Sequence, residues 1–259
     1  MLFRSFGAFV NEAFSVDGWR NFAPLLAAKD TIAGNWLTSL QSGSWLWAYG
    51  CGPAGYTSIP GLVSTSDFST NELNAVFILL FGSYFGDWDT TDNLLRAPLA
   101  GSGTSLAAVW AGRPHWHFYP MGLGQTIGYS TRLTQNENLL GPFNIGVNEM
   151  HVALMGDPTL RQHTLSPPRN LRTRKTSSNT TLLRWDAARE PVSGYHIFVS
   201  PSQSGPFRQL TTLPLSEKRF IVGNSSRTKT YMVRAVKMES TLSGTYLNQS
   251  QGLMITLSR

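Results

Sequence analysis

Two glycine-rich segments contain the residues best suited to chemistry in the first half of the chain. Tyr49-Gly-Cys-Gly-Pro-Ala-Gly-Tyr56 holds the single cysteine, Cys51, and Phe81-Gly-Ser-Tyr-Phe-Gly-Asp-Trp-Asp89 holds Ser83. A thiol or hydroxyl becomes a nucleophile when a nearby base takes its proton. Neither segment contains a histidine. Cys51 therefore also fits a small buried residue at a tight turn, and Ser83 also fits a turn-forming serine.

His115 and His117 form the close histidine pair of the sequence. Alternation in an extended segment would place both imidazoles on one face, as metal ligands or an acid and a base require. The sequence supplies no third partner for them. Local hydrogen bonding beside aromatic residues is the alternative.

Three carboxylates, those of Asp87, Asp89 and Asp92, stand close together in the sequence. Hard cations such as calcium bind several oxygen atoms from short segments, so this cluster predicts a possible calcium site. Calcium is the only cofactor that the sequence indicates. The alternative is that Asp92 caps a helix beginning at Leu94.

Short apolar runs bounded by glycine predict buried strands that position these segments. The runs are Trp45–Tyr49, Ala75–Phe81, Ser105–Ala111 and His151–Met155. Helical spacing is found in Ala8–Leu26, Asp92–Pro98 and Leu123–Leu133. This alternation predicts an α/β fold with a mostly parallel sheet. Ligands of such sheets gather at the carboxyl ends of the strands, where both glycine-rich segments stand.

The 259 residues suggest two domains, and the charge distribution supports a division. Residues 1–164 contain 7 basic and 11 acidic residues, a net charge of −4, whereas residues 165–259 contain 14 and 4, a net charge of +10. The prolines of Leu165-Ser-Pro-Pro-Arg169 stand at this change and cannot continue a helix or a central strand. We therefore expect domains at 1–163 and 166–259.

The second half shows short alternating runs separated by turn residues, as in a β-sandwich. The runs are Thr180–Trp185, Gly194–Val199, Arg219–Val222, Thr230–Val236 and Leu253–Leu257. The Trp that closes one run, the Gly-Tyr that opens the next and a late Tyr-x-Val-x-Ala-Val run resemble a fibronectin type III module. This resemblance implies an all-β immunoglobulin-like sandwich in which Trp185 is a core residue and Tyr231 makes a corner hydrogen bond.

The first half resembles the gingipain-like cysteine peptidases of the caspase-like clan. The closing segment Met150–Arg161, which contains Met-Gly-Asp-Pro-Thr-Leu, is similar to the end of that family's domain. The family ends one strand in Gly-His-Gly and the next in the nucleophilic cysteine, whereas this chain has Gly50-Cys51-Gly52 and Gly82-Ser83. The resemblance implies a partial caspase-like sheet without its first strands. A thiol is a poor base for a serine hydroxyl, so Cys51 and Ser83 do not replace the dyad.

These features predict a catalytically degenerate domain with a fibronectin type III module. Its role is to bind or scaffold a protein or glycan ligand, and the resemblance implies a secreted or cell-surface bacterial protein. The alternative is an active cysteine or serine endopeptidase with Cys51 or Ser83 as nucleophile and His115 or His117 as base. The basic second half suits an anionic glycan or a lipid head-group surface, whereas no nucleic-acid motif is present. No apolar run approaches the roughly 18 residues of a transmembrane helix.

Overall fold

The computed structural model describes residues 2–5, 21–30, 32–87, 89–111, 116–136, 152–223 and 228–257. The chain divides into two compact units. The first comprises Met1–Gln162 with Thr241–Gly244, and the second comprises His163–Ser240 with Thr245–Arg259. Each unit has its own apolar core.

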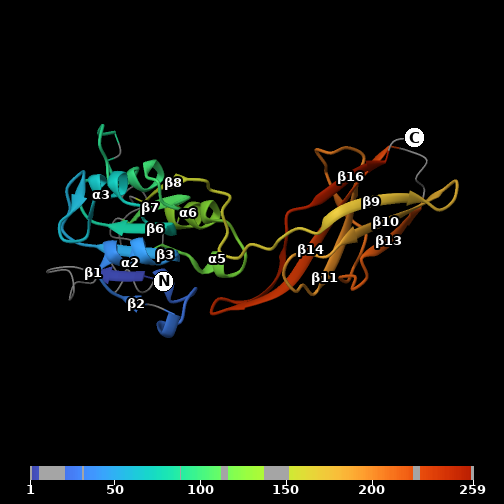
Figure 1. The fold of residues 1–259 in the computed structure, drawn as a ribbon, viewed down its shortest axis with the longest axis horizontal. Helices are drawn as coiled ribbons and strands as arrows, with labels where there is room; N and C mark the ends of the chain where they lie inside the picture. The colour runs from blue at the N-terminus through green and yellow to red at the C-terminus, as the bar shows by residue number, and fades with distance from the viewer. Residues whose placement is uncertain are drawn as a thin grey trace. The chain divides into compact units, whose positions relative to one another are not determined.

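A six-stranded sheet with the order β2-β1-β3-β6-β7-β8 runs through the described part of the first unit (Figure 1). Its strands are β1 (Leu2–Ser5), β2 (Ile32–Ala33), β3 (Trp45–Cys51), β6 (Ala75–Phe81), β7 (Ala107–Ala111) and β8 (Val152–Gly156). Neighbouring strands are parallel except for β7 and β8. The four strands predicted from apolar runs are therefore present, with the last one antiparallel. The short strands β1 and β2 at one edge were not predicted. They precede β3 in the chain, whereas the sequence analysis expected a sheet without its first strands.

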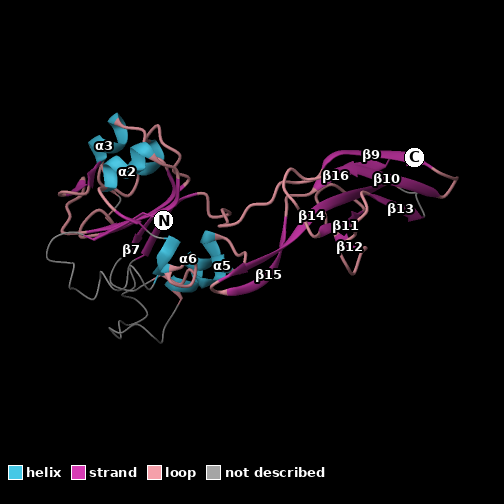
Figure 2. Ribbon diagram, turned by 60° about the horizontal axis from the view of Figure 1, so that its bottom comes forward, coloured by secondary structure: helices cyan, strands magenta, loops and turns pink. Residues whose placement is uncertain are grey.

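Helices cover both faces of this sheet (Figure 2). One face carries α2 (Trp36–Ser42), α3 (Thr65–Thr70) and α4 (Ala97–Ala100), together with the hairpin of β4 (Ser58–Ile59) and β5 (Val63–Ser64). The other face carries α5 (Tyr119–Gly122) and α6 (Ile127–Gln135), and the short 3-10 helix η2 spans Ala28–Asp30. Among the described residues, no helix is long and apolar enough to cross a membrane.

The observed helices correct two predicted boundaries. The helix expected from Asp92 begins at Ala97, because residues 94–96 form a turn in which the Leu95 amide donates to Asn93 Oδ1 over 2.9 Å. The helix expected from Leu123 begins at Ile127, where Thr126 is the N-cap. Most of the segment Ala8–Leu26 lies outside the described residues, so its predicted helix is not tested.

The central strands are apolar throughout because helices pack on both sides of them. Trp47, Tyr49 and Cys51 of β3 point into the cluster that includes α5 and α6. Ala48 of the same strand points into the opposite cluster, which includes α2 and α3. Side chains of successive strand residues alternate between faces, so a strand covered on both sides has no polar positions.

The second unit is an antiparallel β-sandwich. One sheet has the order β13-β10-β9, and the other has β12-β11-β14-β15, with β16 also paired to β14. The strands are β9 (Arg169–Lys175), β10 (Thr180–Asp186), β11 (Gly194–Ser200), β12 (Arg208–Gln209), β13 (Arg219–Gly223), β14 (Lys229–Thr241), β15 (Gly244–Gln249) and β16 (Leu253–Leu257). Side chains from both sheets form one core, including Leu183, Trp185, Ile197 and Val233. All five predicted strands are confirmed; β9, β12 and β15 were not predicted.

Candidate functional site

The ends of β3 and β6 bring together the two glycine-rich segments. These strands are adjacent and parallel, and Cys51 at the end of β3 lies opposite Phe81 at the end of β6. The Gly52 amide donates a hydrogen bond to the Phe81 carbonyl oxygen over 3.1 Å. A Cβ atom on Gly82 would lie 2.6 Å from the Ala54 Cβ and 2.7 Å from the Gly52 carbonyl oxygen. The close approach of the two segments therefore requires glycine at position 82.

Cys51 is a buried residue of the apolar core. Its side chain is 0% exposed and lies in the cluster that contains Trp47, Phe81 and Met121. This environment agrees with the interpretation of Cys51 as a small buried residue. A nucleophile must reach its substrate, and the described structure does not present this thiol to solvent.

Ser83 is exposed in the turn that follows β6. The Phe85 amide donates to the Ser83 carbonyl oxygen over 2.9 Å, and Trp110 Nε1 donates to the Gly82 carbonyl oxygen over 2.9 Å. Tyr84 has a φ of 69°, a left-handed conformation that is uncommon for a bulky residue. The contacts that fix this turn use backbone atoms and an indole. Among the described residues, none hydrogen-bonds the Ser83 hydroxyl and could act as its base.

Two exposed tyrosines face each other at this edge of the sheet. The ring centroids of Tyr56 and Tyr84 are 5.7 Å apart, and the residues are 42% and 59% exposed. The sequence analysis did not identify this pair, although each tyrosine belongs to one of the two glycine-rich segments. Aromatic rings with a polar tip often contact ligands. The strand ends therefore present a surface suited to binding beside the buried Cys51.

The three carboxylates predicted to bind calcium are exposed in the loop after β6. Asp92 Oδ2 accepts a hydrogen bond from Thr65 Oγ1 over 2.8 Å. The Asp87 carbonyl oxygen accepts one from Asn93 Nδ2 over 3.3 Å. The Asp89 side chain makes no hydrogen bond or ion pair with another described residue. Within the described ranges, no three His, Cys, Asp or Glu side chains are grouped as a metal site requires.

A guanidinium group already lies in this loop. Arg96 Nη2 donates to the carbonyl oxygens of Thr90 and Thr91, the second over 2.9 Å. Carbonyl oxygens are common calcium ligands, and a fixed positive charge beside them disfavours a second cation. The calcium interpretation gains no support from these contacts and stays a prediction.

Of the two paired histidines, His117 lies among the described residues. His115 lies outside the described residues. The His117 amide donates to Thr134 Oγ1 over 3.0 Å, and the His117 ring lies 6.5 Å from the Tyr119 ring. The side chain is half-buried beside α5 and α6. A joint role of the two imidazoles in metal binding or catalysis therefore stays a prediction.

The closing segment of the predicted peptidase-like domain has a structural role. The carbonyl oxygens of Leu160 and Pro158 accept hydrogen bonds from the amides of Ile127 and Gly128, over 2.8 and 2.9 Å. These amides belong to the first turn of α6, where helix N–H groups have no partner within the helix. The segment thus caps α6 and ties the antiparallel strand β8 to the helix layer.

A pocket of about 300 Å³ opens between the start of α2 and the β4–β5 hairpin. Its lining includes Asn35, Trp36, Leu62 and Asp67 and includes neither Cys51 nor Ser83. The side-chain oxygen Asn35 Oδ1 accepts from the amide of Thr38, and Asp67 Oδ2 accepts from the amide and hydroxyl of Ser64. The polar groups of this pocket are therefore used to cap α2 and α3.

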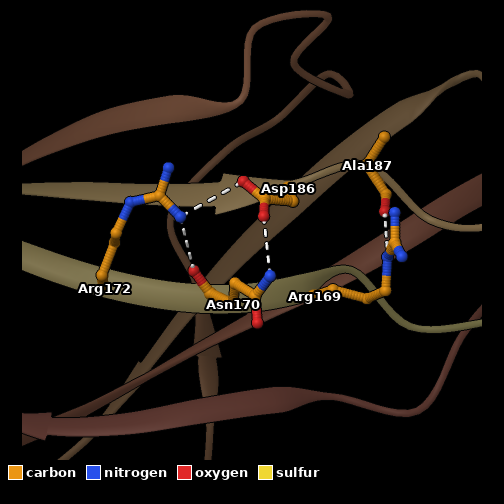
Figure 3. Close-up of polar contacts among 5 residues, drawn as sticks. All are labelled: Arg169, Asn170, Arg172, Asp186 and Ala187. Atoms are coloured by element: carbon orange, nitrogen blue, oxygen red, sulfur yellow. Dashed lines mark hydrogen bonds and ion pairs between the residues drawn. The ribbon is translucent and has the colours of Figure 1, made fainter.

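The second unit has a polar cluster where β9 meets β10 (Figure 3). Asp186 accepts from Asn170 Nδ2 over 2.7 Å and from Arg172 Nη1 over 3.2 Å. The hydrogen bond from Asn170, followed by that from Arg172, lowers the pKa of Asp186. Asn170 has a φ of 52°, and the strand register shifts beside it. Arg169 Nε donates to the Ala187 carbonyl oxygen over 3.1 Å. These contacts hold the side chains of Arg169 and Arg172 beside the change of register.

The second unit consists of two antiparallel sheets that pack around a buried tryptophan, and this arrangement defines its class. Trp185 is 2% exposed and meets the Tyr195 ring edge to face at 5.5 Å. Tyr231 is buried, and burial raises its pKa. Its predicted corner hydrogen bond stays a prediction, because the upstream residues 224–227 lie outside the described ranges. With β9, β10 and β13 in one sheet and β11, β12, β14, β15 and β16 in the other, the second unit is an immunoglobulin-like β-sandwich, the architecture that fibronectin type III modules share.

Comparisons with solved structures match part of the chain. The chain is similar to a Fn3-like protein from Clostridium thermocellum, with 21% sequence identity and a TM-score of 0.27, over 36% of this chain and 92% of that chain. It is also similar to the fn3 domain of human collagen alpha-1(XX) chain, with 19% identity and a TM-score of 0.28, over 36% of this chain and 83% of that chain. No protein-family model matches the chain, and a search of curated proteins finds no match. The assignment of the second unit rests on its strand order.

Proposed function

We propose that this chain is a gingipain-like domain without peptidase activity, joined to a fibronectin type III-like module that binds a protein or glycan ligand. The observation that carries the proposal is Cys51. It stands in Gly50-Cys51-Gly52, where the resembled family has its catalytic histidine, and it is buried. A secreted or cell-surface bacterial location belongs to the same proposal.

The sheet geometry supports the comparison with the family. The family's histidine and cysteine follow two consecutive strands, and here the corresponding strands β3 and β6 are adjacent and parallel. Their carboxyl ends therefore lie at one edge of the sheet, as a dyad requires. The residues at these ends differ from the dyad, because a cysteine and a serine stand where the resembled family has a histidine and a cysteine. Cys51 is buried, whereas Ser83 is exposed.

Proton transfer is the step that these residues do not support. An imidazole has a reference pKa near 6.5 and accepts a proton at neutral pH, whereas a thiol has a reference pKa of about 8.5 and is mostly protonated. A serine hydroxyl needs a positioned base before it attacks a carbonyl. Without such a base, the strand ends and their exposed tyrosines act as a binding surface.

The second candidate function is an active endopeptidase with Ser83 as nucleophile. One observation favours it: Ser83 is exposed beside the strained Tyr84 backbone, and such strain is often found at active sites. His115 or His117 would then have to act as the base. This candidate predicts turnover that depends on Ser83 and on one of these histidines.

Peptide cleavage distinguishes the two candidates. We expect the purified full chain to leave Arg- and Lys-containing fluorogenic peptides intact, because Cys51 is buried and, within the described residues, no base contacts the Ser83 hydroxyl in a position to take its proton. The matched variants are Cys51→Ala and Ser83→Ala, each checked for an unchanged melting temperature. Turnover by the wild-type chain that either variant abolishes would overturn the proposal in favour of the peptidase.

A further inference from the structure

Three arginines lie in one row across the outer face of the β13-β10-β9 sheet. Arg184 of β10 is directly opposite Arg172 of β9 on one side and Arg219 of β13 on the other. Directly opposite residues of antiparallel strands point to the same face. The neighbours of Arg184, Leu183 and Trp185, point into the core. The three guanidinium groups therefore share the exposed face, on strands about 4.8 Å apart.

A further basic side chain extends this row, which we name the arginine face. Arg174 is exposed and lies opposite Leu182 of β10. Residues two apart on a strand lie about 7 Å from each other. Arg172 and Arg174 are two such residues, so the positive charge extends along β9 as well as across the sheet.

Two carboxylates lie at the borders of the arginine face. Asp186 accepts from Arg172 over 3.2 Å, and Glu217 accepts from Arg219 over 2.7 Å. These are exposed pairs, with 58% and 61% of the arginine side chains accessible, and such pairs exchange readily with other ions. Within the described residues, no hydrogen bond or ion pair engages Arg184 at the centre or Arg174 beside it.

Like charges directly opposite each other on a sheet destabilise it unless a counter-ion is present. An acidic residue at the centre would remove this repulsion, yet arginine occupies all three positions of the row. Arginine also binds sulfate and carboxylate groups through two parallel hydrogen bonds. A linear polymer with closely spaced anionic groups would contact several of these guanidinium groups at once.

We infer that the arginine face binds a sulfated polysaccharide. This inference rests on the proposed binding role and names the ligand class. Single-stranded nucleic acid is less suitable, because its binding relies on exposed aromatic rings. The exposed large hydrophobic side chains described in the second unit are Leu213, Ile221, Met238 and Met254, none of them aromatic. A lipid surface needs an apolar segment to insert, and among the described residues Ile221 is the one exposed large apolar side chain on this face.

Binding of a heparin oligosaccharide to the full chain tests the inference. The test variant is Arg174→Gln with Arg184→Gln, because neither side chain has a partner among the described residues. We expect its affinity to fall at least about tenfold, since each lost charge-assisted hydrogen bond weakens binding. The matched control is Arg189→Gln with Arg208→Gln. These exposed residues lie off the arginine face, so the same loss of charge should reduce affinity less than about threefold.

Each other outcome contradicts the inference. Equal losses in the test and control variants would show that only net charge attracts heparin. Tighter binding of single-stranded DNA or of phosphatidylserine vesicles than of heparin would identify another partner class. Heparin binding by the wild-type chain should also weaken steeply as the salt concentration rises. This measurement needs no variant, so it still tests the inference if the double variant does not fold. Peptide cleavage would refute the inactive-domain proposal without changing heparin binding, so the two failures can be distinguished.

Discussion

His196 is a buried histidine whose contacts define its preferred protonation state. It is 3% exposed on β11, and its Nδ1 lies 2.9 Å from Thr211 Oγ1 and 3.2 Å from Gln209 Nε2. The Thr211 hydroxyl already accepts the Ile197 amide hydrogen, so its own hydrogen is free to point to Nδ1. Arg234 stands opposite on β14. Burial lowers the pKa of His196 and outweighs the opposing effect of a hydrogen bond with the Thr211 backbone, so the folded environment favours the neutral ring.

This lowered pKa predicts a pH-dependent stability of the second unit. Below pH 6.5 the unfolded chain binds a proton at His196 that the folded chain resists, so stability falls as the pH falls. The loss is at most about 1.4 kcal/mol at pH 5.5. Denaturation at pH 7.5 and 5.5 should show a larger decrease for the wild-type chain than for His196→Gln. Equal decreases would show that His196 is not responsible.

The carboxylates of the second unit act in a different pH range. Hydrogen bonds lower the pKa values of Asp186, Glu190 and Glu217. Their stabilising effect is present above the ordinary carboxyl pKa, about 4, and is lost at lower pH. These carboxylates therefore contribute little to the comparison between pH 7.5 and 5.5, and the His196→Gln variant distinguishes His196 from the other histidines of the chain.

Strand β10 contributes the largest single side chain to the sandwich core. Trp185 lies between the sheets and meets Tyr195, and its indole nitrogen has no hydrogen-bond partner among the described residues. We expect Trp185→Ala to reduce the free energy of unfolding by about 3 to 5 kcal/mol, because it leaves a large cavity. Trp185→Phe keeps an aromatic ring and removes the unpaired donor, so it should cost clearly less. Similar losses for both variants in denaturant unfolding would contradict the core assignment.

The sequence predicts those elements whose burial matches a simple period. β3 and β6 are covered on both faces and β10 on one, so their apolar patterns are evident. β9 was missed as a strand because five of its seven residues are exposed and it contains four basic residues. β1 and β2 are too short to show a period. The arginine face could not be predicted either. Arg172, Arg184 and Arg219 are far apart in the sequence and become neighbours only because their strands pair in this register.

The two units divide the charge of the molecule, and this division was visible in the composition. The strand ends of the first unit could also be predicted as neighbours, because parallel strands end at one edge. The sequence indicated a buried Cys51 as one alternative but did not reveal the exposed pair Tyr56 and Tyr84. Exposure of these rings depends on how distant parts of the chain pack around the strand ends. The proposed binding surfaces of both units therefore depend on the tertiary structure.

The second unit should fold without the first. Its core comes from its own strands, and about 100 residues are enough to enclose such a core without disulfides. We expect a fragment of residues 163–259 to show β-type circular dichroism and one cooperative thermal transition. Trp185 is the fragment's single tryptophan, so its fluorescence should shift toward the red at the same temperature, as two-state unfolding requires. A disordered fragment, or a tryptophan already exposed to water in the native state, would refute both the independence of this unit and its core.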